Sequence, residues 1–139
     1  MAGTRFQRGL GGQALRFGIS GVLGLGVDTL ALHGLMALGL GFAWARGLSF
    51  LVAATFTWLF NRRHTFAQRQ PVPPSWGEWL RYLGAMAVGG VVNYGASLWA
   101  YQALAPARAW PVIALALGSA AGMVFNFLSA RYLVFRAPR

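Results

Sequence analysis

The sequence predicts an all-α, polytopic membrane protein with four transmembrane helices, arranged as two helical hairpins that repeat each other in parallel. Three observations predict this fold class. Hydrophobic residues make up 57% of the 139 residues and charged residues only 10%, against roughly 25% charged in soluble domains. The apolar residues are gathered in four blocks, each close to the roughly 20 residues that cross a bilayer as a helix. The second half of the chain also resembles the first.

The four apolar blocks give the expected helices and domains. We expect helices at about 17–40, 44–60, 82–104 and 110–128, with continuation of the last to residue 134 left open. The links inside each pair of helices are very short, so each pair forms a hairpin. Residues 1–16 are expected to be a cytoplasmic N-terminal segment, and residues 17–135 a single transmembrane domain. The first block is too long for the apolar region of a signal peptide, so we expect it to be retained.

The link between the second and third blocks is rich in proline and ends in a helix-start pattern. Ser75 and Glu78 have the spacing of a capping box, in which each side chain bonds to the backbone of the other residue. A helix is therefore expected to restart there, with Trp76 and Trp79 at the membrane interface.

The distribution of arginine predicts the orientation in the membrane. Only Arg46 and Arg108 lie beside the short hairpin turns, and we expect Arg46 to extend toward the lipid headgroups. The other ten lie in the two terminal segments and the central link: Arg5, Arg8, Arg16, Arg62, Arg63, Arg69, Arg81, Arg131, Arg136 and Arg139. Because arginine is enriched on the cytoplasmic side, both termini are expected in the cytoplasm.

The internal repeat spans about residues 16–66 and 81–135. A shift of 65 residues aligns Arg16 with Arg81, Phe17 with Tyr82, Gly24 with Gly89, Val27 with Val92, Asp28 with Asn93 and Ala31 with Ala96. A shift of 69 aligns Leu59 with Leu128, Arg62 with Arg131 and Phe66 with Phe135. An even number of spans separates the halves, so they share one orientation, as in parallel repeats related by an axis along the membrane normal.

Asp28 is the one acidic residue inside an apolar block. At about 1.5 Å per residue it lies roughly 16 Å deep, near the middle of the bilayer, where a charged carboxylate costs at least about 2.5 kcal/mol. It must therefore be protonated or face a partner or water. Its repeat mate Asn93 lies at the same depth, so the two could meet across the interior as a polar substrate site. The alternative is a hydrogen-bonded pair that only packs the helices.

Polar residues near the cytoplasmic helix ends are candidates for binding a lipid headgroup. Guanidinium groups bind phosphate through two parallel hydrogen bonds, and amides can bind phosphate or sugar hydroxyls. The alternatives are plain topology and attraction to bulk anionic lipid for the arginines, and helix capping or interhelical bonding for the amides. These candidates are Arg16, Arg62, Arg63, Arg81, Arg131, Asn61 and Asn126.

Composition argues against several other classes of function. The formal net charge of +10 would suit nucleic acid, but the arginines lie between apolar blocks and leave no basic face on a soluble body. The chain has no cysteine, and its two His and two acidic residues lie in separate segments, so we expect no metal site and no cofactor. No nucleophile–base pair is apparent, so we do not expect an enzyme.

The order and spacing of the motifs resemble the GtrA-like family over about residues 16–135. The resemblance rests on the Arg16–Gly21 opening, on Asp28, on Phe60–Phe66 and on Asn126–Phe135. It implies movement of polyprenyl-phosphate-linked sugars across the bacterial inner membrane for cell-surface polysaccharides. Family-like positions are Asp28, Arg62, Arg63, Asn126 and Arg131. The first half has Thr57 in place of Asn126, and Asn61 in place of Ala130, so the halves depart from strict symmetry.

These observations lead to the hypothesis of a flippase for polyprenyl-phosphate (undecaprenyl-type) sugars. Arginines would hold the phosphate, and the polar pair at mid-depth would ease passage of the sugar. Four helices make a thin wall around a headgroup, so a homo-oligomer, most simply a dimer, is expected. Two alternatives remain: a small proton-coupled multidrug exporter that uses Asp28, and a membrane anchor or scaffold for a glycosyltransferase partner.

Overall fold

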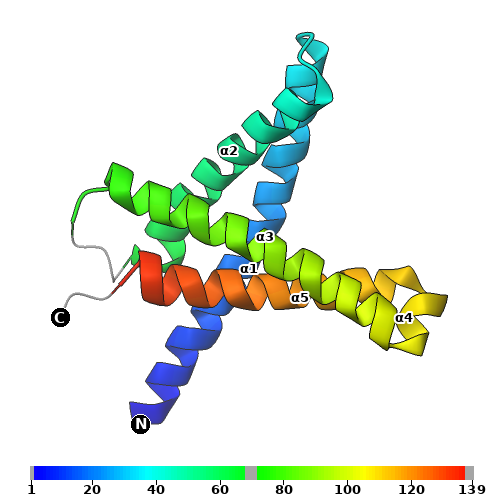
Figure 1. Ribbon diagram of the computed structural model, residues 1–139. Coiled ribbons are helices and arrows are strands. Elements are labelled where there is room, and N and C mark those ends of the chain that lie inside the picture. Colours follow the sequence, from blue (N-terminus) through cyan, green and yellow to red (C-terminus); the bar gives the residue numbers. More distant parts are fainter. Residues whose placement is uncertain (1, 68–71, 137–139) are drawn as a thin grey trace. The chain divides into compact units, whose positions relative to one another are not determined.

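The computed structural model describes residues 2–67 and 72–136, and these residues are helical almost throughout, with no strand among them. Arg69 and Arg139, and the side chains of Arg5 and Arg8, lie outside the described part. The elements in chain order are α1 (Ala2–Ala37), α2 (Phe42–Phe60), η1 (Asn61–Thr65), α3 (Trp76–Ala103), α4 (Ala105–Ala109), α5 (Pro111–Ser129) and η3 (Ala130–Val134) (Figure 1).

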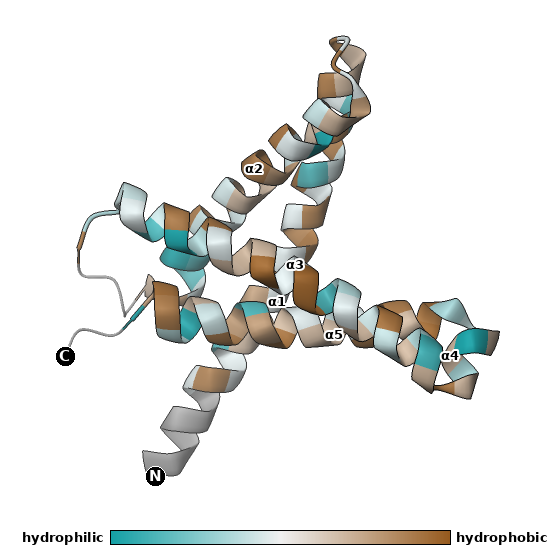
Figure 2. Ribbon diagram, in the orientation of Figure 1, coloured by the Kyte–Doolittle hydropathy of each residue, from teal (hydrophilic) through white to brown (hydrophobic). Residues whose placement is uncertain are grey.

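The all-helical class is confirmed, but the expected number of spans is confirmed only in part. Within the described residues, three stretches are long and apolar enough to cross a membrane: 9–37, 42–65 and 111–134. α3 has 28 residues and is not among them, because Asn93 and the glycines in its middle lower its mean hydropathy. Figure 2 shows hydrophobic residues along α2 and α5 and hydrophilic ones on the turn that carries α4.

The helices group into two compact units, which we describe separately. The first unit contains α1, α2, η1 and the start of α3, and it also includes Phe135. The second unit runs from Gly84 to Val134 and contains the rest of α3 with α4, α5 and η3. We call the end of each unit that holds the short connection its turn end, and the opposite end its loop end.

The turn end of the first unit is closed by a glycine. Gly39 has φ +94°, a left-handed conformation that glycine adopts without steric cost. Its N–H donates to the Met36 carbonyl at 3.0 Å, and the Leu40 N–H donates to the Leu35 carbonyl at 3.2 Å. These bonds end α1 in the manner of a C-terminal glycine cap, and α2 begins at Phe42.

Both units end in a wide helical turn at matching positions. η1 and η3 are π-helical segments of five residues each, and their first residues, Asn61 and Ala130, are 69 positions apart. Such turns are rare and are often found at functional sites. The residues that follow, Phe66 and Phe135, are both buried in the first unit, and their rings stack with centroids 5.1 Å apart. The two π-helical segments therefore begin at positions that the predicted repeat aligns.

The start of α3 forms half of the expected capping box. The Ser75 hydroxyl accepts a hydrogen bond from the Glu78 N–H at 3.2 Å. The Glu78 carboxylate does not return to Ser75, however, because it bonds instead to Trp58 and Arg62 of the helix ahead of it. Tertiary contacts have therefore replaced the local half of the motif.

Candidate functional site

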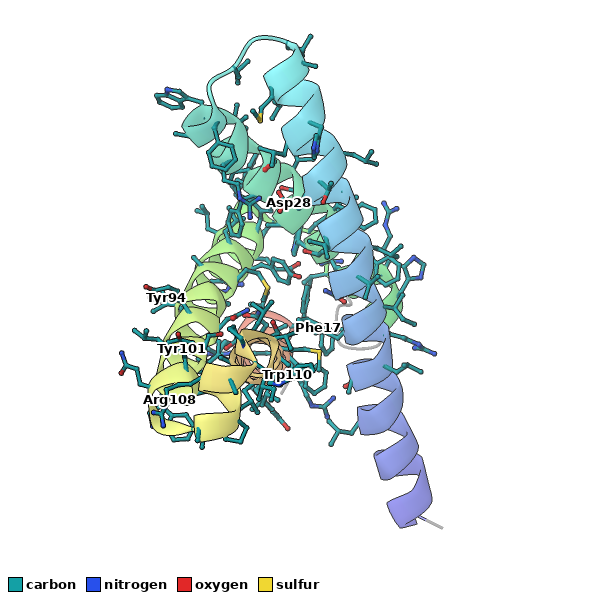
Figure 3. The ribbon with its side chains drawn as sticks, turned by 90° about the vertical axis from the view of Figure 1, so that its right-hand side faces the viewer. Phe17, Asp28, Tyr94, Tyr101, Arg108 and Trp110 are labelled. Atoms are coloured by element: carbon teal, nitrogen blue, oxygen red, sulfur yellow. The ribbon has the colours of Figure 1, made fainter. Side chains whose placement is uncertain are left out.

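Asp28 has a charged partner in the first unit. The Arg46 guanidinium of α2 donates to Asp28 Oδ2 at 2.6 Å, and Figure 3 shows Asp28 between α1 and α2. Arg46 was expected to reach toward the headgroups, but the carboxylate attracts it more strongly, since an ion pair in low dielectric outweighs exposure of one charge. The Ser49 hydroxyl lies 3.4 Å from the same Arg46 nitrogen. The buried acid is therefore explained by a partner that the sequence did not reveal.

Asn93, the repeat mate of Asp28, lies in a tightly packed part of the second unit. The Ser97 hydroxyl donates to Asn93 Oδ1 at 3.5 Å. A Cβ added at Gly118 would lie 2.5 Å from the Asn93 carbonyl oxygen, and one at Gly122 would lie 2.8 Å from the Asn93 Cβ. Asn93 thus lies where α3 and α5 approach each other closely. The expected meeting of Asp28 and Asn93 stays a prediction.

Three arginines gather at the loop end of the first unit. Arg16 of α1 donates to the His64 carbonyl of η1 at 3.1 Å. This bond places Arg16 beside Arg62 and Arg63, which precede His64 in η1. Arg63 is exposed. The clustering expected from the repeat is therefore present for α1 and η1.

Arg62 makes an ion pair that holds the fold together. Its Nε donates to Glu78 Oε1 at 2.8 Å, and the Trp58 indole N–H donates to the same oxygen at 2.8 Å. The side chains of Arg62 and Glu78 are 12% and 6% exposed. A second Arg62 nitrogen donates to the Val72 carbonyl. The sequence predicts Glu78 only as a helix cap. Because it is one of two acidic residues in the chain, its rarity could have indicated that it pairs with an arginine.

Asn61 belongs to a buried hydrogen-bonded chain beside this ion pair. Its Nδ2 donates to the Tyr82 hydroxyl at 3.0 Å, which donates to Thr57 Oγ1 at 3.1 Å. The Thr65 hydroxyl donates to Asn61 Oδ1 at 2.8 Å. Asn61 is 1% exposed, so its side chain ties α2 and η1 to α3. This arrangement agrees with the structural alternative for Asn61 more than with ligand binding.

Arg81 lies next to Tyr82 on α3, so it belongs to the same end of the first unit. It is exposed, whereas Tyr82 is 1% exposed. The packing of Tyr82 against η1 therefore brings a fourth arginine to the loop end. The resulting group is Arg16, Arg62, Arg63 and Arg81.

Asn126 faces a glycine in the second unit. The nearest atoms to a Cβ placed on Gly89 are those of the Asn126 side-chain amide. Its Oδ1 is buried and has no hydrogen-bond partner among the described residues. In the first unit the repeat mates make the same contact, since a Cβ on Gly24 would lie 2.5 Å from Thr57 Cγ2. Asn126 therefore provides a buried acceptor where the first unit has a threonine.

Arg131 lies in η3 at the loop end of the second unit and is 5% exposed. Its guanidinium carbon is 5.4 Å from the centroid of the Tyr132 ring. It thus occupies the position in the second unit that Arg62 occupies in the first.

A family model settles the relationship that the motifs indicated. The model for the transmembrane domain of GtrA/DPMS proteins matches residues 16–135. The chain belongs to this family. No curated protein and no solved structure matches the chain.

Membership in the GtrA/DPMS family, together with three apolar helices, makes the chain a multi-pass membrane protein. The family is generally non-catalytic and is associated with processes that involve sugar-carrying lipids. The first unit has an arginine cluster at its loop end and the ion pair of Asp28 with Arg46 near its turn end. The second unit offers a buried arginine and a buried amide acceptor.

Proposed function

We propose that this protein moves a polyprenyl-phosphate-linked sugar across the bacterial cytoplasmic membrane, with both termini in the cytoplasm. The observation that carries the proposal is the gathering of Arg16, Arg62, Arg63 and Arg81 at one end of the first unit, in a chain whose family is associated with sugar-carrying lipids. A phosphate that enters the membrane interface needs donors that replace its water shell. Guanidinium groups supply them in a planar fork.

The arginines do not contribute equally to this proposal. Arg62 is occupied by Glu78 and by a backbone carbonyl, so its main part is to hold the loop end together. Arg63 and Arg81 are exposed, so their side chains can reorient to bind a headgroup. Arg131, the repeat mate of Arg62, is the candidate from the second unit. We therefore assign phosphate binding in the first unit chiefly to Arg63 and Arg81, at the end of the unit that also holds Arg16. Arg131 is a separate candidate in the second unit.

The contacts of Asp28 argue against the exporter alternative. A proton-coupled exporter of cations needs a carboxylate that a cationic substrate can reach. Here Arg46 already supplies the positive charge at 2.6 Å, and the arginine-rich loop end would repel a cation. The alternative of a glycosyltransferase scaffold is compatible with the same contacts, and the transport experiment separates it from a flippase.

The proposal is tested by reconstitution into vesicles that carry polyprenyl-phosphate glucose in one leaflet. Movement is followed by oxidation of the sugar with periodate, which does not cross the membrane. We expect Arg63→Gln and Arg131→Gln each to slow movement about tenfold, since a charged hydrogen bond is worth about 1.5–3 kcal/mol. Arg108→Gln is the matched control, because Arg108 lies in α4 at the turn end and bonds to the Gln102 carbonyl.

The outcomes separate the alternatives. Movement by the wild type and by Arg108→Gln, with slow movement by the two loop-end variants, supports the flippase. Equal movement by all four proteins would refute the phosphate site. A wild type that moves no lipid but copurifies with a glycosyltransferase would favour the scaffold. Because Arg131 is buried, a folding defect in that variant leaves exposed Arg63 as the decisive position.

A further inference from the structure

Asp28 and Arg46 have bonding capacity beyond the ion pair that joins them. Both side-chain hydrogen bonds of Arg46 are made by one nitrogen, Nη1, which donates to Asp28 and to Ser49. A guanidinium carries five donor hydrogens, so others remain available. The Arg46 side chain is 49% exposed and that of Asp28 is 17% exposed. Asp28 Oδ1 has no hydrogen-bond partner among the described residues. The pair therefore combines a buried acceptor oxygen that lacks a partner among these residues with a half-exposed guanidinium that has further donors.

We infer that Asp28 and Arg46 form a site for sugar hydroxyl groups near the turn end of the first unit. The inference rests on the proposed function, since it concerns the sugar of the same lipid. The pair carries no net charge, so it has little attraction for a phosphate anion. A hydroxyl both donates and accepts, so adjacent hydroxyls can donate to the carboxylate and accept from the guanidinium. The chemistry thus selects the neutral, hydroxyl-rich part of the headgroup.

The pair lies far enough from the arginine cluster to be a second, separate binding site. Arg46 and Arg62 lie on the same continuous helical stretch, and about 1.5 Å per residue puts them roughly 24 Å apart along its axis. A single sugar phosphate is far shorter than this distance. One headgroup therefore cannot contact both places at once, and contact with the pair must come before or after contact with the arginines.

Packing alone does not require an ion pair at this place. In the second unit the repeat mates of Asp28 and Arg46 are Asn93 and Leu115, and those helices pack closely through Gly118 and Gly122. A hairpin of this family can thus be held together without a charged pair. Arg46 balances the charge of Asp28, but helix packing does not account for the presence of two charges that are costly to place in a membrane. A ligand of the pair would account for both.

The inference is tested with two lipids in the same vesicle assay: polyprenyl-phosphate glucose and its 4,6-dideoxy analogue, which lacks the two hydroxyls farthest from the phosphate. We expect the wild type to move the glucose lipid at least about tenfold faster than the analogue, as expected for a lost charged hydrogen bond. Asp28→Asn combined with Arg46→Gln should lose this preference. Arg46→Lys keeps the charge but not the planar fork, so it should fold and still lose most of the preference.

Exchanging the two charges tests whether the ion pair binds a ligand or only holds α1 and α2 together. Asp28→Arg combined with Arg46→Asp restores an ion pair between α1 and α2 but moves the carboxylate to the other helix. Loss of preference in this variant, with thermal stability close to wild type, supports the site. Wild-type preference in the swap or in the neutral pair would overturn the inference. So would a wild type that moves both lipids equally fast, whereas a wild type that moves neither lipid refutes the proposed function itself.

Discussion

The two units of this protein share a backbone plan and differ in charge. In both, the second helix of the hairpin ends in a π-helical turn, in η1 and η3, and both place small residues at matching buried positions, such as Ala45 and Ala114. Both acidic residues of the chain, however, belong to the first unit, and each forms an ion pair with an arginine there. The two units therefore have a π-helical turn and small buried residues at corresponding positions, but different polar contacts.

The polar contacts of the two units differ at corresponding positions of α2 and α5. Ser49, Ala53 and Thr57 of α2 correspond to Gly118, Gly122 and Asn126 of α5. In the first unit the hydroxyl of Ser49 lies near the ion pair at Asp28, whereas in the second the glycines admit the backbone and side chain of Asn93. Both units thus have a close contact at a glycine, a common way to pack membrane helices, and the first unit has ion pairs in addition.

The largest effect that we predict comes from breaking the ion pair at the loop end of the first unit. Glu78→Gln keeps an acceptor for Trp58 but leaves Arg62 as a buried charge without its carboxylate. Loss of one member of a buried pair costs about 3 kcal/mol or more. The free energy of unfolding in mixed micelles, followed by circular dichroism, measures this loss.

The control for this prediction is the neutral double variant Glu78→Gln with Arg62→Met. It removes both charges, so its stability should recover most of the loss seen in Glu78→Gln. Arg63→Gln, at an exposed neighbouring position, should leave stability nearly unchanged. If Glu78→Gln were as stable as the wild type, the pair would not hold the loop end together, and Arg62 would return as a leading phosphate ligand.

A smaller effect is expected from a single methyl group in the second unit. In Gly118→Ala the new Cβ would lie 2.5 Å from the Asn93 carbonyl oxygen and would also meet the Ser97 hydroxyl. The clash includes a backbone atom, so the helices must separate, and overpacking of this kind costs about 1–3 kcal/mol. The same unfolding measurement tests it. Gly90→Ala, with nothing within 4 Å of the new Cβ, is the matched control and should be neutral or slightly stabilising.

The hydrophobic blocks and the repeat allowed most of the fold to be predicted. Apolar length alone determines a spanning helix, so α2 and α5 were expected within two residues of their observed starts, 44 against Phe42 and 110 against Pro111. The start of α1 was missed by more, since it begins at Ala2 rather than near residue 17. The arginines before residue 17 are compatible with a helix, because arginine is a good helix former, so they did not mark the helix start.

The site was less predictable than the fold because its contacts join residues far apart in the chain. The sequence predicts that Asp28 is protonated or faces a partner or water. It does not identify Arg46, 18 positions away, which it places at the headgroups instead. Glu78 was interpreted through its local spacing to Ser75, yet its strongest contacts are with the preceding helix. Sequence spacing indicates which residues share a helix face, but not which face of another helix lies opposite.

The smallest predicted effect concerns the helix starts of α3 and α5. α3 starts with a side-chain cap from Ser75, whereas α5 starts with Pro111 at its first position and no side-chain cap. Ser75→Ala should cost about 1 kcal/mol, and the loss should shift the unfolding midpoint while leaving the Arg62–Glu78 pair intact. Ser75→Asp, which preserves an acceptor at the cap, should restore the midpoint. A loss as large as that of Glu78→Gln would instead mean that the cap and the ion pair act as one unit, since Glu78 takes part in both.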